Sequence, residues 1–207
     1  MVSKTGTLMI ISGPSGVGKG TVVKKILESN NNVKLSVSAT TRKKRLGEVD
    51  GVDYHFYSKE DFLKLCENGE MLEYAEYCGN FYGTPSKPIE NWLKIGKDVL
   101  LEIEIKGAKK IKKKCKDCVA VFLLPPSLDV LYNRLKGRGT EDEMAVQCRL
   151  ERAKEELRCA DFYDYLVVNT EVEKGASDIL SILKAEKLKF SNMNSFLKEV
   201  LDSDCGY

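Results

Sequence analysis

Short apolar runs alternate with amphipathic segments through most of the chain. The apolar runs predict buried strands at 8–12, 33–38, 99–105, 119–124 and 165–168. Helical spacing predicts helices at 19–29 and 107–114, and a third that begins at Ser127 and ends at a glycine break near 137. A capping box at Thr140 and Glu143 predicts the start of a further helix that runs to about 158, and amphipathic helical segments follow the last strand. Alternating strands and helices are typical of a mainly parallel sheet covered by helices on both faces, so the pattern predicts an α/β fold.

The pattern changes between residues 40 and 84. Short aromatic runs there are separated by Gly, Asp and Asn, which predicts a small, partly antiparallel β insertion with one helix at 59–68. A chain of 207 residues with 43% apolar content can form one α/β core with small insertions, and is short for two independent domains. We therefore expect a single domain over residues 1–207.

Charge and cysteine content exclude several classes of function. A formal net charge of +2 gives no field that would favour nucleic acid or a membrane surface. The apolar start of the chain is too short for a signal sequence or a membrane span, so we expect a cytoplasmic protein.

Seven scattered cysteines argue against a disulfide framework. Cys115 and Cys118 have the spacing of a zinc or redox half-site, but with one distant histidine, His55, we favour free thiols.

A glycine-rich loop after the first strand is the strongest local signal. Residues 13–21 read GPSGVGKGT, between a predicted strand and a predicted helix. Glycines let successive backbone N–H groups turn toward one concavity, and the helix N-terminus adds positive potential there. The expected phosphate-binding residues are Gly13, Ser15, Gly16, Gly18, Lys19, Gly20 and Thr21. Gly20 stands where the P-loop motif has a hydroxyl, and Thr21 supplies one a residue later. The loop by itself does not separate a kinase from a GTPase or an ATPase.

A second segment narrows the choice. Residues 36–54 read SVSATTRKKRLGEVDGVDY, which resembles the guanylate kinase signature. The resemblance continues through Glu73, 81–84, 101–107, 134–140 and Arg149, over roughly residues 6–185. It implies a P-loop nucleoside monophosphate kinase fold with a core at 1–38, 85–136 and 159–207, a β-rich GMP-binding segment at 39–84, and a helical lid at 137–158. The implied reaction transfers the γ-phosphoryl group of ATP to GMP, giving ADP and GDP.

The GMP-binding residues follow from chemistry and from this resemblance together. Arg42 and Arg45 offer two guanidinium forks to a monophosphate. The resemblance adds the hydroxyls of Tyr54 and Tyr82. Guanine presents N1–H and a 2-amino group side by side, a donor pair that one carboxylate accepts. The resemblance assigns this reading to Glu73, and the remaining expected GMP-binding residues are Ser38, Thr84 and Glu104.

The expected catalytic residues carry positive charge. Phosphoryl transfer depends on positioning and charge neutralisation, so the resemblance gives this role to Lys19, Arg42, Arg134, Arg138 and Arg149. Asn169 is expected to contact the adenine, and Arg152 to pair with Glu155 or Glu156. The departures at Gly20 and Glu104, which stands where the family usually has Asp, favour Mg²⁺ held by phosphates and water, near Thr21 and Glu104, with no direct protein ligand.

Three alternatives stay open at this point. A kinase for another nucleoside monophosphate fits the glycine-rich loop but not residues 42–54. A P-loop GTPase would need an N-K-x-D segment, which the chain lacks. A guanylate-kinase-like scaffold module binds phosphopeptides, and such modules usually lose the phosphate cradle that Gly13, Gly18 and Lys19 form here. We therefore expect an enzyme with ATP and GMP as its partners, as a monomer or weak homodimer.

Overall fold

The computed structural model describes residues 6–77, 79–137 and 143–203. Its centre is a five-stranded sheet with the order β2-β7-β1-β8-β9, and every neighbouring pair is parallel. The strands are β1 (Leu8–Ser12), β2 (Val33–Leu35), β7 (Asp98–Glu102), β8 (Val119–Leu124) and β9 (Tyr165–Val168). The predicted α/β class, with its mainly parallel sheet, is confirmed.

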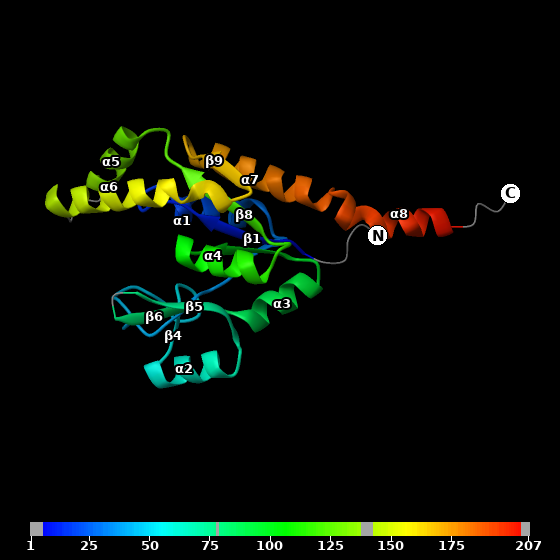
Figure 1. Cartoon of the computed structure of the whole chain (residues 1–207), viewed down its shortest axis with the longest axis horizontal. Helices are drawn as coiled ribbons and strands as arrows, with labels where there is room; N and C mark the ends of the chain where they lie inside the picture. Colours follow the sequence, from blue (N-terminus) through cyan, green and yellow to red (C-terminus); the bar gives the residue numbers. More distant parts are fainter. Residues whose placement is uncertain (1–5, 78, 138–142, 204–207) are drawn as a thin grey trace.

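Helices cover both faces of this sheet (Figure 1). Successive side chains of a strand point to opposite faces. Met9 and Ile11 of β1 accordingly pack in one core and Ile10 in the other. The first core is closed by α1 (Lys19–Ser29) and α7 (Val172–Lys187), and the second by α3 (Ser86–Lys94) and α4 (Ile105–Lys114). Because both faces of β1 are covered, its run of apolar residues is continuous rather than alternating.

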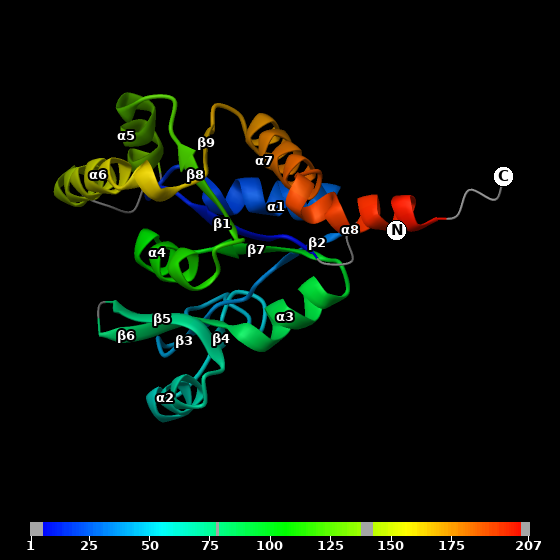
Figure 2. The same ribbon diagram turned by 45° about the vertical axis from the view of Figure 1, so that its right-hand side comes forward.

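A second, four-stranded sheet lies beside α4 (Figure 2), and we call it the small sheet. Its order is β4-β3-β6-β5, with β3 (Ala39–Thr40), β4 (His55–Phe56), β5 (Met71–Tyr77), β6 (Asn80–Pro85) and one helix, α2 (Lys59–Glu67). Phe62 of α2 is fully buried in a separate apolar cluster with Ala39 and Met71. The predicted β insertion with one helix is confirmed.

The remaining helices lie at the two ends of the molecule. α5 (Leu128–Lys136) starts at Ser127, whose hydroxyl accepts the Val130 N–H at 3.1 Å. α5 packs against α6 (Glu143–Arg158), which a short 3₁₀ turn, η1 (Ala160–Phe162), follows. At the other end, α8 (Phe190–Asp202) projects past the sheet in both views (Figures 1 and 2). No helix in these described ranges is long and apolar enough to cross a membrane.

Three sequence predictions need correction. The strands predicted at 33–38 and 99–105 end early, at Leu35 and Glu102, and α4 begins at Ile105 rather than at 107. The sequence analysis predicted no helix at residues 86–94, where the structure has α3. Pro88 is the third residue of α3, in the first turn, where a missing N–H costs no helical hydrogen bond. The predicted capping residue Thr140 lies outside the described residues.

The separate core of the small sheet gives a stability prediction. Replacing Phe62, which is fully buried, with Ala should lower the free energy of unfolding by about 3–5 kcal/mol, because it removes apolar contacts and leaves a cavity. Urea denaturation followed by circular dichroism measures this. The matched control is Phe190→Ala on α8, where the side chain is 71% exposed and the loss should stay below about 0.5 kcal/mol. Equal losses would contradict the assignment of Phe62 to a packed core.

Candidate active site

The glycine-rich loop connects the end of β1 to the start of α1. Gly16 and Gly18 have φ angles of 85° and 96°, in the left-handed region. A Cβ atom on Gly16 would lie 2.7 Å from the Leu135 side chain, and one on Gly18 would lie 2.8 Å from Asn169 Nδ2. The loop therefore needs glycine at both positions to turn its backbone N–H groups into one cradle.

Two predicted site residues, Arg134 and Asn169, form hydrogen bonds with the backbone of this loop. The Asn169 side-chain amide donates to the Val17 carbonyl at 2.7 Å, and the Arg134 guanidinium donates to the same carbonyl at 3.2 Å and to the Asn169 carbonyl at 3.0 Å. Asn169 is buried. Neither residue lines the two cavities described next, so in this structure both support the loop.

The larger cavity, of about 540 Å³, opens in front of the loop. Lys19 lines it and donates to the Gly13 and Pro14 carbonyls, at 2.6 and 3.3 Å. Arg149 reaches it from α6 and donates to the Ser15 hydroxyl at 2.7 Å. Its charged lining residues among those described are Lys19, Arg149, Arg152, Asp53, Glu102, Glu104 and Glu156. Three cations thus face four carboxylates.

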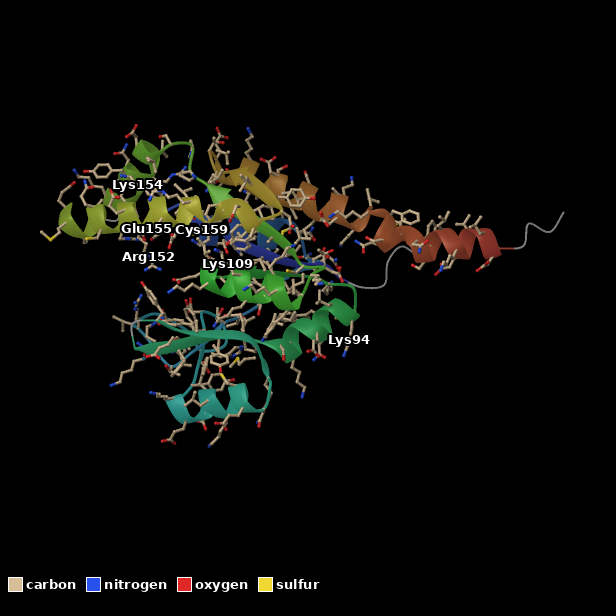
Figure 3. All side chains as sticks on the ribbon, viewed as in Figure 1. Lys94, Lys109, Arg152, Lys154, Glu155 and Cys159 are labelled. Carbon is tan, nitrogen blue, oxygen red and sulfur yellow. The ribbon has the colours of Figure 1, made fainter. Side chains whose placement is uncertain are left out.

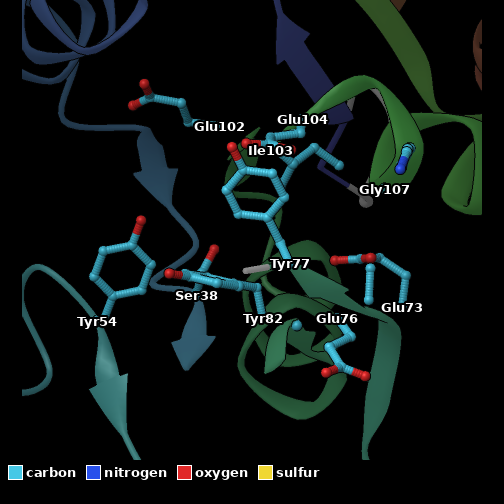
Figure 4. Close-up of a pocket in the computed structure, with 13 residues that line it drawn as sticks. Ser38, Tyr54, Glu73, Glu76, Tyr77, Tyr82, Glu102, Ile103, Glu104 and Gly107 are labelled. Atoms are coloured by element: carbon cyan, nitrogen blue, oxygen red, sulfur yellow. The ribbon is translucent and has the colours of Figure 1, made fainter. Parts of the chain in front are cut away.

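The smaller cavity, of about 230 Å³, lies against the small sheet (Figure 4). Glu73 of β5 is only 6% exposed, and one of its carboxylate oxygens accepts the Thr84 hydroxyl at 2.9 Å. Burial raises the pKa of Glu73 above its ordinary value, and the hydrogen bond from Thr84 opposes this. A Cβ atom on Gly107 would lie only 3.1 Å from the other carboxylate oxygen of Glu73. Any larger residue at position 107 would therefore crowd the Glu73 carboxylate. Ser38, Tyr54, Tyr82 and Glu104, all predicted GMP-binding residues, line the same cavity.

Arg42 lies at the edge of these aromatic residues. Its Cζ is 5.4 Å from the centre of the Tyr54 ring, and the Tyr54 and Tyr82 rings are 6.1 Å apart. Its guanidinium also forms a two-pronged ion pair with Glu48. The second predicted fork, Arg45, is exposed, and its backbone N–H donates to Glu48 at 2.8 Å. The structure therefore brings Arg42 and the two tyrosines together and leaves Arg45 in solvent.

Glu102 and Tyr77 line both cavities and were not predicted as site residues. The sequence analysis assigned an acidic site residue of this segment to Glu104, within the predicted strand at 99–105. The strand ends at Glu102 instead, and Glu104 precedes α4 with a 61% exposed side chain. Burial raises the pKa of Glu102, and the nearby Lys19 ammonium opposes the rise. The sequence signal that was available for Glu102 is its place directly after the apolar residues 99–101.

Arg152 lies closer to the site than predicted. It pairs with Glu156 at 3.1 Å, as expected, and also with Glu104 at 3.5 Å. It donates to the Tyr77 hydroxyl, and its Cζ lies 5.0 Å from the centre of the Tyr77 ring. Figure 3 shows Arg152 on the side of α6 that faces the small sheet. Arg152 therefore connects α6 to the small sheet across the larger cavity. The predicted catalytic residue Arg138 lies outside the described residues.

No preformed metal cluster of three or more His, Cys, Asp or Glu side chains occurs in the part of the chain that the structure describes. Cys115 and Cys118 are free thiols, as predicted. Burial raises the pKa of Cys118 to about 11, so little of the thiolate that zinc or redox chemistry needs is present near neutral pH.

Comparison with known proteins identifies the family. The family model for guanylate kinase matches residues 5–186. Guanylate kinase of Clostridioides difficile is 51% identical over 199 residues, covering 96% of this chain and 97% of that protein. The enzyme of Lactococcus lactis is 55% identical over 181 residues, 87% of this chain and 88% of that protein.

A solved structure agrees with these sequence matches. The crystal structure of guanylate kinase from Anaplasma phagocytophilum has a TM-score of 0.79 and 38% sequence identity, covering 98% of this chain and 97% of that one. The phosphate cradle, the buried Glu73 and the paired cavities lie within the residues that the family model covers. By sequence and by fold, the chain belongs to the guanylate kinase family.

Proposed function

We propose that the larger cavity receives the phosphates of ATP and the smaller cavity receives GMP, for the phosphoryl transfer that guanylate kinases catalyse. The observation that carries this proposal is that the two cavities adjoin. They share lining residues, namely Ser38, Tyr54, Tyr77, Glu102, Ile103 and Glu104. A phosphate cradle and a base-sized pocket with a buried carboxylate thus lie side by side, as a two-substrate transfer requires.

Glu73 reads the guanine base in this proposal. Its carboxylate is buried and accepts one hydrogen bond from the described residues, from Thr84, so it can accept further donors. Guanine supplies two, N1–H and the 2-amino group. Adenine has an acceptor at N1 and no 2-amino group, and it would leave the buried carboxylate without donors, which costs on the order of 1–3 kcal/mol or more. The pocket therefore favours GMP over AMP.

Arg42, Tyr54 and Tyr82 hold the GMP phosphate. Tyr54 and Tyr82 line the smaller cavity, the Arg42 guanidinium lies against the Tyr54 ring, and the donors of all three are of the kinds that bind a phosphate dianion. Arg45 is exposed on the adjoining loop and would have to turn inward to contribute. Its role as a second fork rests on the family resemblance.

The glycine-rich loop and Lys19 hold the β- and γ-phosphates of ATP. The Lys19 ammonium donates hydrogen bonds to two loop carbonyls. Phosphate oxygens could take the place of these carbonyls as acceptors, so the ammonium would keep its hydrogen bonds when ATP binds. Arg149 already lies against the loop at Ser15, where it can neutralise charge that develops on the transferring group. Arg134 and Asn169 keep the loop in shape.

The residues of the larger cavity fit a bound Mg²⁺. The described lining of this cavity carries four carboxylates and three cations, so it does not by itself neutralise the triphosphate of ATP that it would receive. Magnesium usually combines one or two carboxylates with phosphate oxygens and water. Glu102 and Glu104 are the carboxylates placed at the junction of the cavities that would hold it, directly or through water. The ion would neutralise charge on the phosphate oxygens.

The chemistry needs little from the protein beyond this placement. The GMP phosphate is already anionic near pH 7, so no general base has to remove a proton. Arg42 and the tyrosines orient the attacking oxygen, and Lys19 and Arg149 hold the γ-phosphoryl group in line with it. Approach of segments 39–84 and 137–158 to each other would exclude water, which otherwise hydrolyses ATP. The intact phosphate cradle favours this enzyme over a phosphopeptide-binding scaffold.

Lys19→Ala tests the ATP half of the site. Turnover of ATP with GMP should fall at least about 100-fold, because the variant lacks the charge that neutralises the β- and γ-phosphates. A coupled assay for ADP release measures turnover, and a thermal melt should show an unchanged midpoint. Lys24→Ala, an exposed lysine on the same helix, is the matched control and should keep full activity. Retained turnover in Lys19→Ala would remove the assignment of the loop.

Glu73→Gln tests base recognition. The KM for GMP should rise by about 10- to 100-fold, because an amide cannot accept both guanine donors, while the KM for ATP stays unchanged. The preference for GMP over AMP should narrow, since the amide can donate to adenine N1. Steady-state assays with both nucleotides measure this, with Glu67→Gln on the exposed face of α2 as control. Equal effects on GMP and ATP would argue against base reading by Glu73.

A further inference from the structure

We propose that Glu48 is a positioning residue for the GMP phosphate: it holds one edge of the Arg42 guanidinium and turns the other edge toward the phosphate. This inference rests on the proposed function, which places the phosphate at Arg42. Sequence reasoning did not single out Glu48, because nothing in the order of residues shows which acidic side chain meets which arginine.

The contacts divide the guanidinium into two edges. Arg42 Nη1 donates to Glu48 Oε2 at 3.0 Å, and Nη2 donates to Oε1 at 2.7 Å. Nη1 also donates to the Lys43 carbonyl, at 2.8 Å. A guanidinium has five N–H donors in one plane. Three are used, and among the described residues no carboxylate or carbonyl takes the other two, on Nε and Nη2. These two point side by side from the neighbouring edge of the guanidinium, which is the geometry that binds two phosphate oxygens.

Aromatic rings fix the plane in which this edge lies. The Arg42 Cζ is 5.4 Å from the centre of the Tyr54 ring and 5.7 Å from that of Phe56. The rings restrict tilting of the guanidinium, and the two-pronged contact with Glu48 restricts its rotation within the plane. The Glu48 contact raises the pKa of Arg42, and the Tyr82 hydroxyl adds to the rise, so a predicted phosphate-binding hydroxyl lies at the same guanidinium.

Glu48 is itself held by the loop. Besides Arg42, its carboxylate accepts the Arg45 backbone N–H at 2.8 Å, and its own N–H donates to the Arg45 carbonyl at 3.2 Å. Its side chain is 18% exposed. The guanidinium of Arg42 and the Arg45 N–H lower the pKa of Glu48 to about 2, so it is charged throughout the neutral range. If the Glu48 carboxylate moved away to make room for phosphate, its three hydrogen bonds to Arg42 and to the Arg45 N–H would break. Phosphate that binds at the other edge of the Arg42 guanidinium leaves these three hydrogen bonds in place.

Glu48→Gln is the test, with Glu67→Gln as the matched control on the exposed face of α2. The amide presents one acceptor and one donor where two guanidinium donors need acceptors, so Arg42 loses its fixed orientation. The KM for GMP should rise about tenfold, with kcat and the KM for ATP nearly unchanged. Binding of guanosine, which has the base but no phosphate, should be unaffected by calorimetry or NMR titration. A loss of guanosine binding equal to that of GMP would show a general role in folding and overturn the inference.

A double-variant comparison separates Glu48 from the proposed site itself. Arg42→Ala should raise the KM for GMP, and adding Glu48→Gln to it should have little further effect, because Glu48 acts through Arg42. Additive effects would overturn the positioning role. A lower KM for GMP in Glu48→Gln alone would also overturn it, since that result means that Glu48 competes with the phosphate. If Arg42→Ala leaves the KM for GMP unchanged, the proposed phosphate site fails and the inference fails with it.

Discussion

The parallel pairing of β1 with β7 is the constraint on which the rest of the site depends. In this register Ile11 lies opposite Glu102, one residue before the end of β1 and at the end of β7. The glycine-rich loop leaves the sheet from β1 at that edge, so a carboxylate and a phosphate cradle meet there. Carboxyl ends of parallel strands gather at one edge of a sheet, and ligands of such folds bind in the crevice outside that edge. Both cavities include Glu102 for this reason.

The small sheet reaches the same edge through α4. Lys110 and Lys114 of α4 donate to the backbone carbonyls of Tyr74 and Leu72 in β5. These bonds hold the strand that carries Glu73 against a helix of the main body. Burial without enough donors makes the ionised form of Glu73 costly, as its raised pKa indicates. Under the proposed function, a ligand with two adjacent N–H donors relieves this cost and a ligand without them does not, so the burial that raises the pKa of Glu73 would also make the pocket selective.

The sequence was sufficient for features that depend on local order. The glycine-rich loop, the alternation of strands with helices and the change of pattern near residue 40 each follow from neighbouring residues. The family resemblance pointed to Glu73, which is buried and lines the smaller cavity. Contacts between distant segments could not be predicted in the same way. Glu102 and Glu104 differ by two positions, and only the length of the β7 ladder decides which one ends the strand. Glu156, one helical turn from Arg152, is enough to explain a charged residue at that position. The sequence therefore gives no reason to predict the second contact of Arg152, with Tyr77, which lies 75 positions away.

α6 joins these parts because of helical spacing. Arg149 and Arg152 are three residues apart and therefore lie on one face of the helix. The first contacts Ser15 in the glycine-rich loop, and the second contacts Tyr77 in the small sheet. A single helix face thus contacts residues that line the two cavities. Under the proposed function, a nucleotide that displaced one of these residues would also change the contacts that the same helix makes with the other.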